Sequence, residues 1–116
     1  MSIDGIWTGE ILGTYEWENS GVYILEAGRI VGGNNRHYST GTYELSGTDY
    51  SARVIVHYYG PPRAIFSEVR KEFEINVSGK LTDDTIEATV VRTDRPGTEV
   101  IYRMTKRMAL PAKADT

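Results

Sequence analysis

The sequence predicts an all-β fold, an eight-stranded antiparallel barrel in which successive strands pair in up-and-down order. Apolar and polar residues alternate in short segments, and turn residues interrupt these segments about every ten positions. The 116 residues include 12 glycines and 8 tyrosines, a composition typical of pleated strands and tight turns. We therefore expect one β-barrel domain over residues 1–107 and a flexible C-terminal tail over residues 108–116.

The first half of the chain contains four predicted strands. Glycine and asparagine residues, which tolerate a positive φ, separate them. Residues 13–20 are polar and aromatic, and they form either a loop or the ragged end of a hairpin. The four strands are expected at residues 5–12, 21–27, 29–32 and 40–45.

The second half of the chain contains four more. Residues 50–59 give the clearest alternation, with Ala52, Val54 and Val56 on one side. Arg95-Pro96-Gly97 is a strong turn signal and is expected to reverse the chain before the last strand. The remaining three strands are expected in the later part of residues 64–77, which could begin as a helical turn, and at residues 85–92 and 98–106.

Each of these strands has one apolar face that has to be shielded from water. Two stacked sheets or one closed sheet would achieve this. The loops are mostly short, which suits up-and-down order, and closure leaves no exposed edge strands. We favour the closed barrel, whose interior at eight strands is either filled by side chains or holds one small ligand.

The strand alternation directs a set of mostly aromatic side chains inward. Aromatic rings with polar tips could line a cavity for a small apolar ligand. Alternatively, they fill the barrel and bond their hydroxyls near its ends, which is the favoured alternative because filled interiors are usual at eight strands. The candidate cavity residues are Trp7, Tyr43, Val56, Tyr58, Phe73 and Tyr102.

Some apolar residues occupy the alternate strand positions, whose side chains point outward to water. If they gather into one patch, they mark an interface, and a two-fold homodimer is the commonest use of such a patch. The candidate dimer face consists of Ile55, Tyr59, Val91 and Ile101.

No arrangement of reactive side chains points to catalysis, and we expect no enzyme, metal or cofactor. The chain has no cysteine, and no serine lies in a nucleophile elbow. His37 is expected to be exposed and His57 to face outward, without carboxylates at ligand spacing. Asp83-Asp84 lies in a turn, where two adjacent carboxylates shape the backbone rather than converge across a cleft.

The overall charge and the N-terminal sequence narrow the expected partners and location. A net charge of −3 argues against nucleic-acid binding, which depends on phosphate neutralisation. No apolar run is long enough to cross a membrane. The start of the sequence lacks the basic and apolar stretches of an export signal, so we expect a cytoplasmic protein.

One stretch of turns and apolar positions carries a family resemblance. It comprises Asp4-Gly5-Ile6-Trp7, residues 21–34, then Gly41 and Tyr43, and later residues 77–80 with Asp84-Thr85. On these motifs the chain resembles the GrlR family, the negative regulators of type III secretion and their uncharacterised proteobacterial relatives. The resemblance extends over nearly the whole chain.

The resemblance implies a lipocalin-like barrel, a homodimer and cytoplasmic regulation by protein contact. In the secretion regulator, an acidic run on the loop after the fourth strand binds a transcriptional activator. The candidate partner-binding loop here is Thr48, Asp49 and Tyr50, of which only Asp49 is acidic. The expected function is therefore a non-catalytic regulator that binds a transcriptional regulator through surface loops. The alternative is a carrier of a small apolar ligand inside the barrel.

Overall fold

The computed structural model describes residues 2–61 and 71–113, and eight β-strands account for most of them. The described residues contain no helix. The strands are β1 Gly5–Leu12, β2 Trp17–Glu26, β3 Arg29–Gly33, β4 His37–Ser46, β5 Asp49–Tyr58, β6 Glu72–Thr82, β7 Thr85–Arg92 and β8 Arg95–Met108. The start of the predicted segment 64–77 and the last residues of the predicted tail lie outside the described residues.

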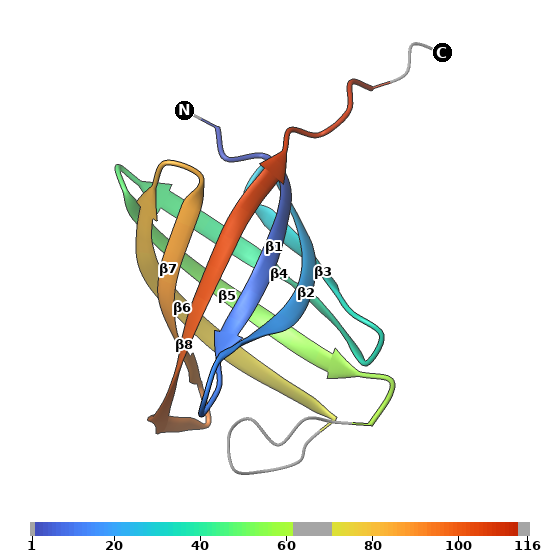
Figure 1. Ribbon diagram of the computed structural model, residues 1–116, viewed down its shortest axis with the longest axis vertical. Coiled ribbons are helices and arrows are strands. Elements are labelled where there is room, and N and C mark those ends of the chain that lie inside the picture. The colour runs from blue at the N-terminus through green and yellow to red at the C-terminus, as the bar shows by residue number, and fades with distance from the viewer. Residues whose placement is uncertain (1, 62–70, 114–116) are drawn as a thin grey trace.

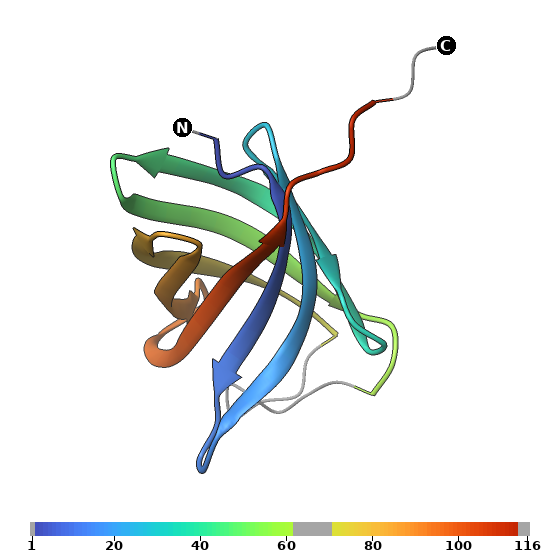
Figure 2. The same ribbon diagram turned by 45° about the horizontal axis from the view of Figure 1, so that its top comes forward.

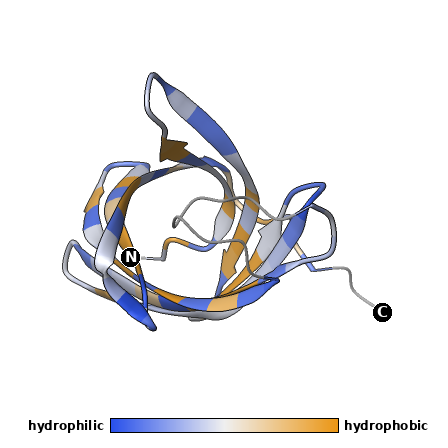
Figure 3. Cartoon of the chain, turned by 90° about the horizontal axis from the view of Figure 1, so that it is seen from below, coloured by the Kyte–Doolittle hydropathy of each residue, from blue (hydrophilic) through white to orange (hydrophobic). Residues whose placement is uncertain are grey.

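The eight strands form one closed antiparallel barrel. Each strand pairs with its neighbours in the sequence, and β8 pairs with β1, where Gly9 lies opposite Met104. Figures 1 and 2 show the strands winding around the barrel, and Figure 3 shows the closed ring of strands seen along it. The predicted all-β class and up-and-down order are confirmed, and the architecture is consistent with a lipocalin-like barrel.

The first hairpin is longer than the sequence predicted. β2 begins at Trp17, opposite Leu12, so residues 17–20 belong to the strand. A tight turn at residues 13–16 closes the hairpin, where the Gly13 amide donates to the Glu16 carbonyl over 2.9 Å. The following turn has positive φ at Ala27 and Gly28 (51° and 82°), as a two-residue type I′ hairpin requires.

The prediction that the chain reverses at residues 95–97 is wrong. The chain reverses at Thr93-Asp94, so Arg95 already pairs with Arg92 at the start of β8. The Asp94 carboxylate accepts two bonds from the Arg92 guanidinium, at 2.9 and 2.6 Å, which fixes the reversal. Pairing resumes only at Glu99, opposite Val91, so the Pro-Gly pair lies in a register irregularity instead of the turn.

Part of the hydrophobic core, including Ile3, Trp7 and Leu25, lies outside the cavity lining at one end of the barrel, which we call the packed end. This is the end from which both chain termini leave in Figure 1. Trp7 and Leu25 are completely buried there, and the Trp7 indole donates to the Ile3 carbonyl over 3.0 Å. The packed end therefore closes one side of the interior, and any internal space lies beyond it.

Candidate functional site

The barrel interior holds a cavity of about 470 Å³, a volume within the usual range for small-molecule sites. Its walls come mainly from β5 to β8, and most of the side chains that form them are apolar. The apolar lining includes Ala52, Val54, Val56, Phe73, Ile75, Val77, Ile86, Val90, Val100 and Met104.

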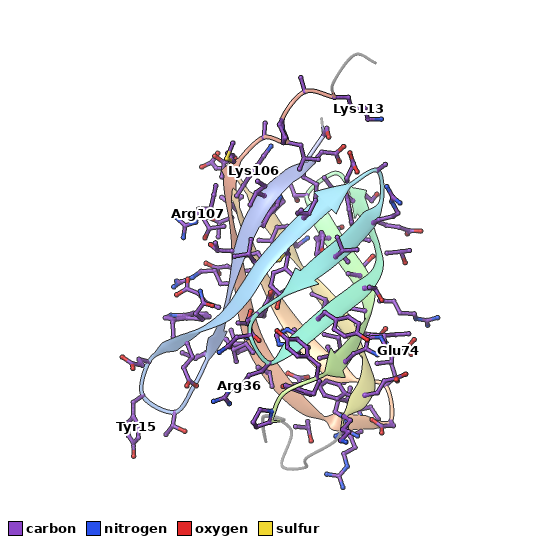
Figure 4. The ribbon with its side chains drawn as sticks, turned by 90° about the vertical axis from the view of Figure 1, so that its right-hand side faces the viewer. Tyr15, Arg36, Glu74, Lys106, Arg107 and Lys113 are labelled. Carbon is purple, nitrogen blue, oxygen red and sulfur yellow. The ribbon has the colours of Figure 1, made fainter. Side chains whose placement is uncertain are left out.

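The cavity extends from the core toward the opposite end of the barrel, which we call the polar end. Glu18, Asn34 and Arg36 line it there. Glu18 and Arg36 are themselves exposed, so this end of the cavity reaches the protein surface. Figure 4 shows Arg36 toward the lower end of the barrel, far from Lys106, Arg107 and Lys113. The basic residues late in the sequence therefore do not contribute to this site.

A cluster of four polar side chains interrupts the apolar lining: Ser20, Tyr23, His37 and Tyr102. The Ser20 hydroxyl donates to the Tyr102 oxygen over 3.3 Å and lies 3.4 Å from the Tyr23 oxygen. The Tyr23 hydroxyl donates to the Ser20 carbonyl over 3.1 Å and lies 3.3 Å from Nε2 of His37. Strands β2, β4 and β8 thus bring one group of hydroxyls together inside the barrel. We call this group the hydroxyl cluster.

Burial makes the phenols of the hydroxyl cluster harder to ionise. Desolvation raises the pKa of Tyr23, partly offset by its hydrogen bonds to Ser20 and Tyr102. Desolvation likewise raises the pKa of Tyr102 well above its ordinary value. Both phenols therefore retain their protons at neutral pH and can donate hydrogen bonds as well as accept them.

Four of the six predicted cavity residues line the cavity: Val56, Tyr58, Phe73 and Tyr102. The prediction was wrong for Trp7 and Tyr43, which lie outside the lining. Trp7 packs in the core at the packed end. The Tyr43 ring stacks on Tyr50, and its hydroxyl donates to the Asp4 carboxylate over 3.2 Å. Both side chains point inward as expected, but beyond the end of the cavity.

The predicted partner-binding loop is only partly available to a partner. Tyr50 is 2% exposed and lines the cavity, so its inclusion in a surface loop was wrong. Asp49 begins β5, is exposed and pairs with Lys80. Thr48 is exposed in the turn, where its carbonyl accepts a bond from the Leu81 amide over 2.8 Å.

The predicted dimer face does not form one patch. Strand β6 separates Ile55 from Val91, because Ile55 lies opposite Glu74 and Val91 lies opposite Asn76. Val91 is only half-buried, whereas Ile101 is exposed on β8, the strand beyond.

Ile55 instead lies in a row of outward positions on β2 to β5 that is apolar except at Thr40. Ile24 lies opposite Val31, Val31 opposite Thr40, and Thr40 opposite Ile55. Next to this row, Tyr38 stacks on Tyr59 with ring centroids 6.2 Å apart. We call the exposed group Val22, Ile24, Val31, Tyr38, Ile55 and Tyr59 the outer strip.

Sequence reasoning missed the buried polar residues, which in the described part of the chain are Ser20, His37, Ser39 and Arg92. His37 was expected to be exposed, but it is buried and lines the cavity, so that expectation was wrong. Strand alternation could have predicted this burial. His37 and Ser39 lie an even number of residues before Tyr43 on β4, so their side chains point to the same inner face. Arg92 is 1% exposed, held by Asp94 and packed over the Phe73 ring at 5.4 Å.

The described residues show no metal-binding arrangement. Residues 2–61 and 71–113 contain no group of three or more histidine, aspartate or glutamate side chains that could hold a metal ion. His57 has one acidic neighbour, Glu72, with Nδ1 3.3 Å from the carboxylate. Nor does this part of the chain contain a helix of the length and apolar character needed to cross a membrane.

The fold and the site together define a closed eight-stranded β-barrel with an internal, mainly apolar cavity. No protein family matches the chain when it is compared with family-wide sequence patterns. No curated protein matches it either. The resemblance to the GrlR family therefore stays a prediction.

Proposed function

We propose that this protein binds one small, largely apolar molecule inside its barrel. The observation that carries the proposal is the cavity of about 470 Å³, lined by apolar side chains and reaching the surface at the polar end. Burying apolar ligand surface in such a site provides the binding free energy. The cavity wall offers apolar surface and hydroxyl groups that can bind a ligand. The sequence contains no cysteine and no serine in a nucleophile elbow.

Filling the cavity should abolish binding. Ala52 lines the cavity from β5, so in Ala52→Phe the new ring occupies space that the ligand needs. We expect the affinity for the fluorescent probe N-phenyl-1-naphthylamine to fall at least about tenfold, equivalent to about 1.4 kcal/mol. A fluorescence titration measures this change.

Two further variants make this test specific. Ser51→Phe adds the same ring to the neighbouring residue, which is exposed, and should leave probe binding unchanged. Val90→Phe, from the cavity wall on β7, provides a second filling variant if Ala52→Phe does not fold. Probe binding that survives both filling variants, or that is lost in Ser51→Phe, would contradict an internal site.

Regulation by protein contact, the function implied by the resemblance, remains a second proposal. It is supported by the exposed Thr48 and Asp49 at the β4–β5 turn. A transcriptional regulator remains the expected partner, and with it a role in type III secretion. Since Tyr50 is buried, a binding test should change Thr48 and Asp49 and leave Tyr50 in place.

We also propose that the expected homodimer forms through the outer strip, with two copies related by a two-fold axis. The outer strip joins adjacent outward positions on four strands, whereas Val91 and Ile101 lie beyond β6. Val31→Lys should convert the dimer to a monomer in sedimentation velocity, because a lysine would be desolvated at the interface. Ile101→Lys is the matched control and should remain a dimer. A wild-type protein that is monomeric at tens of micromolar would refute the proposal.

A further inference from the structure

The hydroxyl cluster gives the cavity a chemical preference. Three hydroxyls and one imidazole from β2, β4 and β8 lie together in the cavity wall, bonded to or in contact with one another and bordered by apolar side chains such as Val56 and Met104. A purely apolar ligand would cover these groups without replacing any hydrogen bonds that they make to water, and that burial carries a cost. A ligand with one polar atom placed at the cluster avoids this cost.

The side-chain contacts within the cluster are long, whereas the Tyr23 hydroxyl donates to the Ser20 carbonyl over 3.1 Å. The two contacts from Ser20 Oγ and the contact from Tyr23 to His37 measure 3.3–3.4 Å, whereas hydroxyl hydrogen bonds are usually about 2.7–2.8 Å. Hydroxyl hydrogens rotate to suit their acceptors. A ligand oxygen at normal distance would therefore offer the Ser20 and Tyr102 hydroxyls a better acceptor than they offer each other.

Space at the cluster depends on β1. A side chain at Gly9 would collide with the Tyr102 hydroxyl and would lie 2.7 Å from Ser20 Oγ. Glycine at this position therefore leaves room for the Tyr102 phenol against the barrel wall. Tyr102 also lines the cavity, so its hydroxyl borders the space that the ligand would occupy.

The charges around the cavity argue against a charged ligand. Arg92 is buried but already paired with Asp94, and Arg36 lines the polar end together with Glu18. The buried phenols are neutral donors. An ionised carboxylate placed among them would lose its hydration without gaining a full opposite charge.

We propose that the ligand is an uncharged, largely apolar molecule with one hydrogen-bond-accepting oxygen, which Tyr102 and its neighbours in the hydroxyl cluster bind. This inference rests on the proposed binding function and specifies the ligand class. A ketone, an ester or a comparable neutral oxygen compound meets the description.

Three ligands of nearly equal size test the preference: 2-ethylnaphthalene, 2-acetylnaphthalene and 2-naphthoate. Each is titrated against the complex of the protein with N-phenyl-1-naphthylamine. A purely apolar cavity would favour the hydrocarbon, because it has the least hydration to lose. We expect the ketone to displace the probe at least about fivefold more effectively than the hydrocarbon, as one net hydrogen bond provides. The carboxylate should be the weakest competitor.

Tyr102→Phe removes the hydroxyl and keeps the ring. In this variant the preference for the ketone over the hydrocarbon should disappear, while the probe still binds. Tyr43→Phe is the control, because its hydroxyl bonds to Asp4 outside the cavity lining. If Tyr102→Phe does not fold, Ser20→Ala serves as the second variant, with the same expected loss of preference.

The possible outcomes separate the two proposals. Failure of the wild-type protein to bind the probe or any of the three compounds overturns the binding function itself. Probe binding with the hydrocarbon equal to the ketone, or with the carboxylate the strongest competitor, overturns the ligand class alone. A ketone preference that survives both Tyr102→Phe and Ser20→Ala also overturns it.

Discussion

Trp7→Ala is expected to lower the free energy of unfolding by about 3–5 kcal/mol, the usual cost of truncating a large buried aromatic side chain. Trp7 is completely buried at the packed end, where its ring packs in the core cluster with Ile3 and Leu25. Truncation also removes the indole donor from the Ile3 carbonyl, which it reaches over 3.0 Å. Urea unfolding followed by circular dichroism measures the loss.

Trp17→Ala is the matched control for this large effect. Trp17 is only half-buried, and its ring lies under the Arg103 guanidinium, 4.0 Å from the ring centroid. Losing that contact should cost about 1 kcal/mol. If Trp7→Ala costs no more than Trp17→Ala, the packed end does not support the barrel as described.

Alkaline pH is expected to destabilise the protein strongly through its buried tyrosines. Desolvation raises the pKa of Tyr50 and Tyr102 in the folded state, whereas in the unfolded chain both phenols titrate near pH 10. Above about pH 10 the unfolded chain has released these protons and the folded protein retains them, so rising pH favours unfolding. Above about pH 10, each phenol should lower the free energy of unfolding by up to about 1.4 kcal/mol per pH unit. Below about pH 10 the phenol is protonated in both states, so the stability no longer depends on its ionisation.

The pH effect is tested by comparing variants across the same range. Urea unfolding between about pH 9 and pH 11.5 should show a shallower loss of stability in Tyr50→Phe than in the wild-type protein. Tyr15→Phe is the control, because Tyr15 is 97% exposed at the tip of the first hairpin and should not change the slope. Identical slopes for Tyr50→Phe and the wild-type protein would contradict the assigned burial of this phenol.

The architecture could be predicted from the sequence because strand alternation is a local signal. Residues 5–12 and 85–92 coincide with β1 and β7, and the inward parity of Ala52, Val54 and Val56 is observed. The same parity implies that Tyr50 points inward, yet the resemblance placed it in a surface loop. Applying the alternation to the whole strand would have avoided that error.

The position of a residue along the barrel axis could not be read from alternation. Trp7 and Tyr102 both point inward, but only the register of β1 with β8 places Trp7 at the packed end and Tyr102 beside the cavity. The outer strip likewise depends on pairing across four strands. Such relations between distant segments arise on closure and leave no short-range pattern in the sequence.

The central claim is that a small molecule binds inside the barrel, and the most direct test is to locate a bound probe. Methyl-labelled protein titrated with N-phenyl-1-naphthylamine should show the largest chemical-shift changes at Val54, Val77 and Val90, which line the cavity. The changes should saturate at one probe per chain. Shifts confined to Val22, Ile24 and Val31 on the outer strip would mean that the probe binds outside the barrel, and that result would contradict an internal binding site.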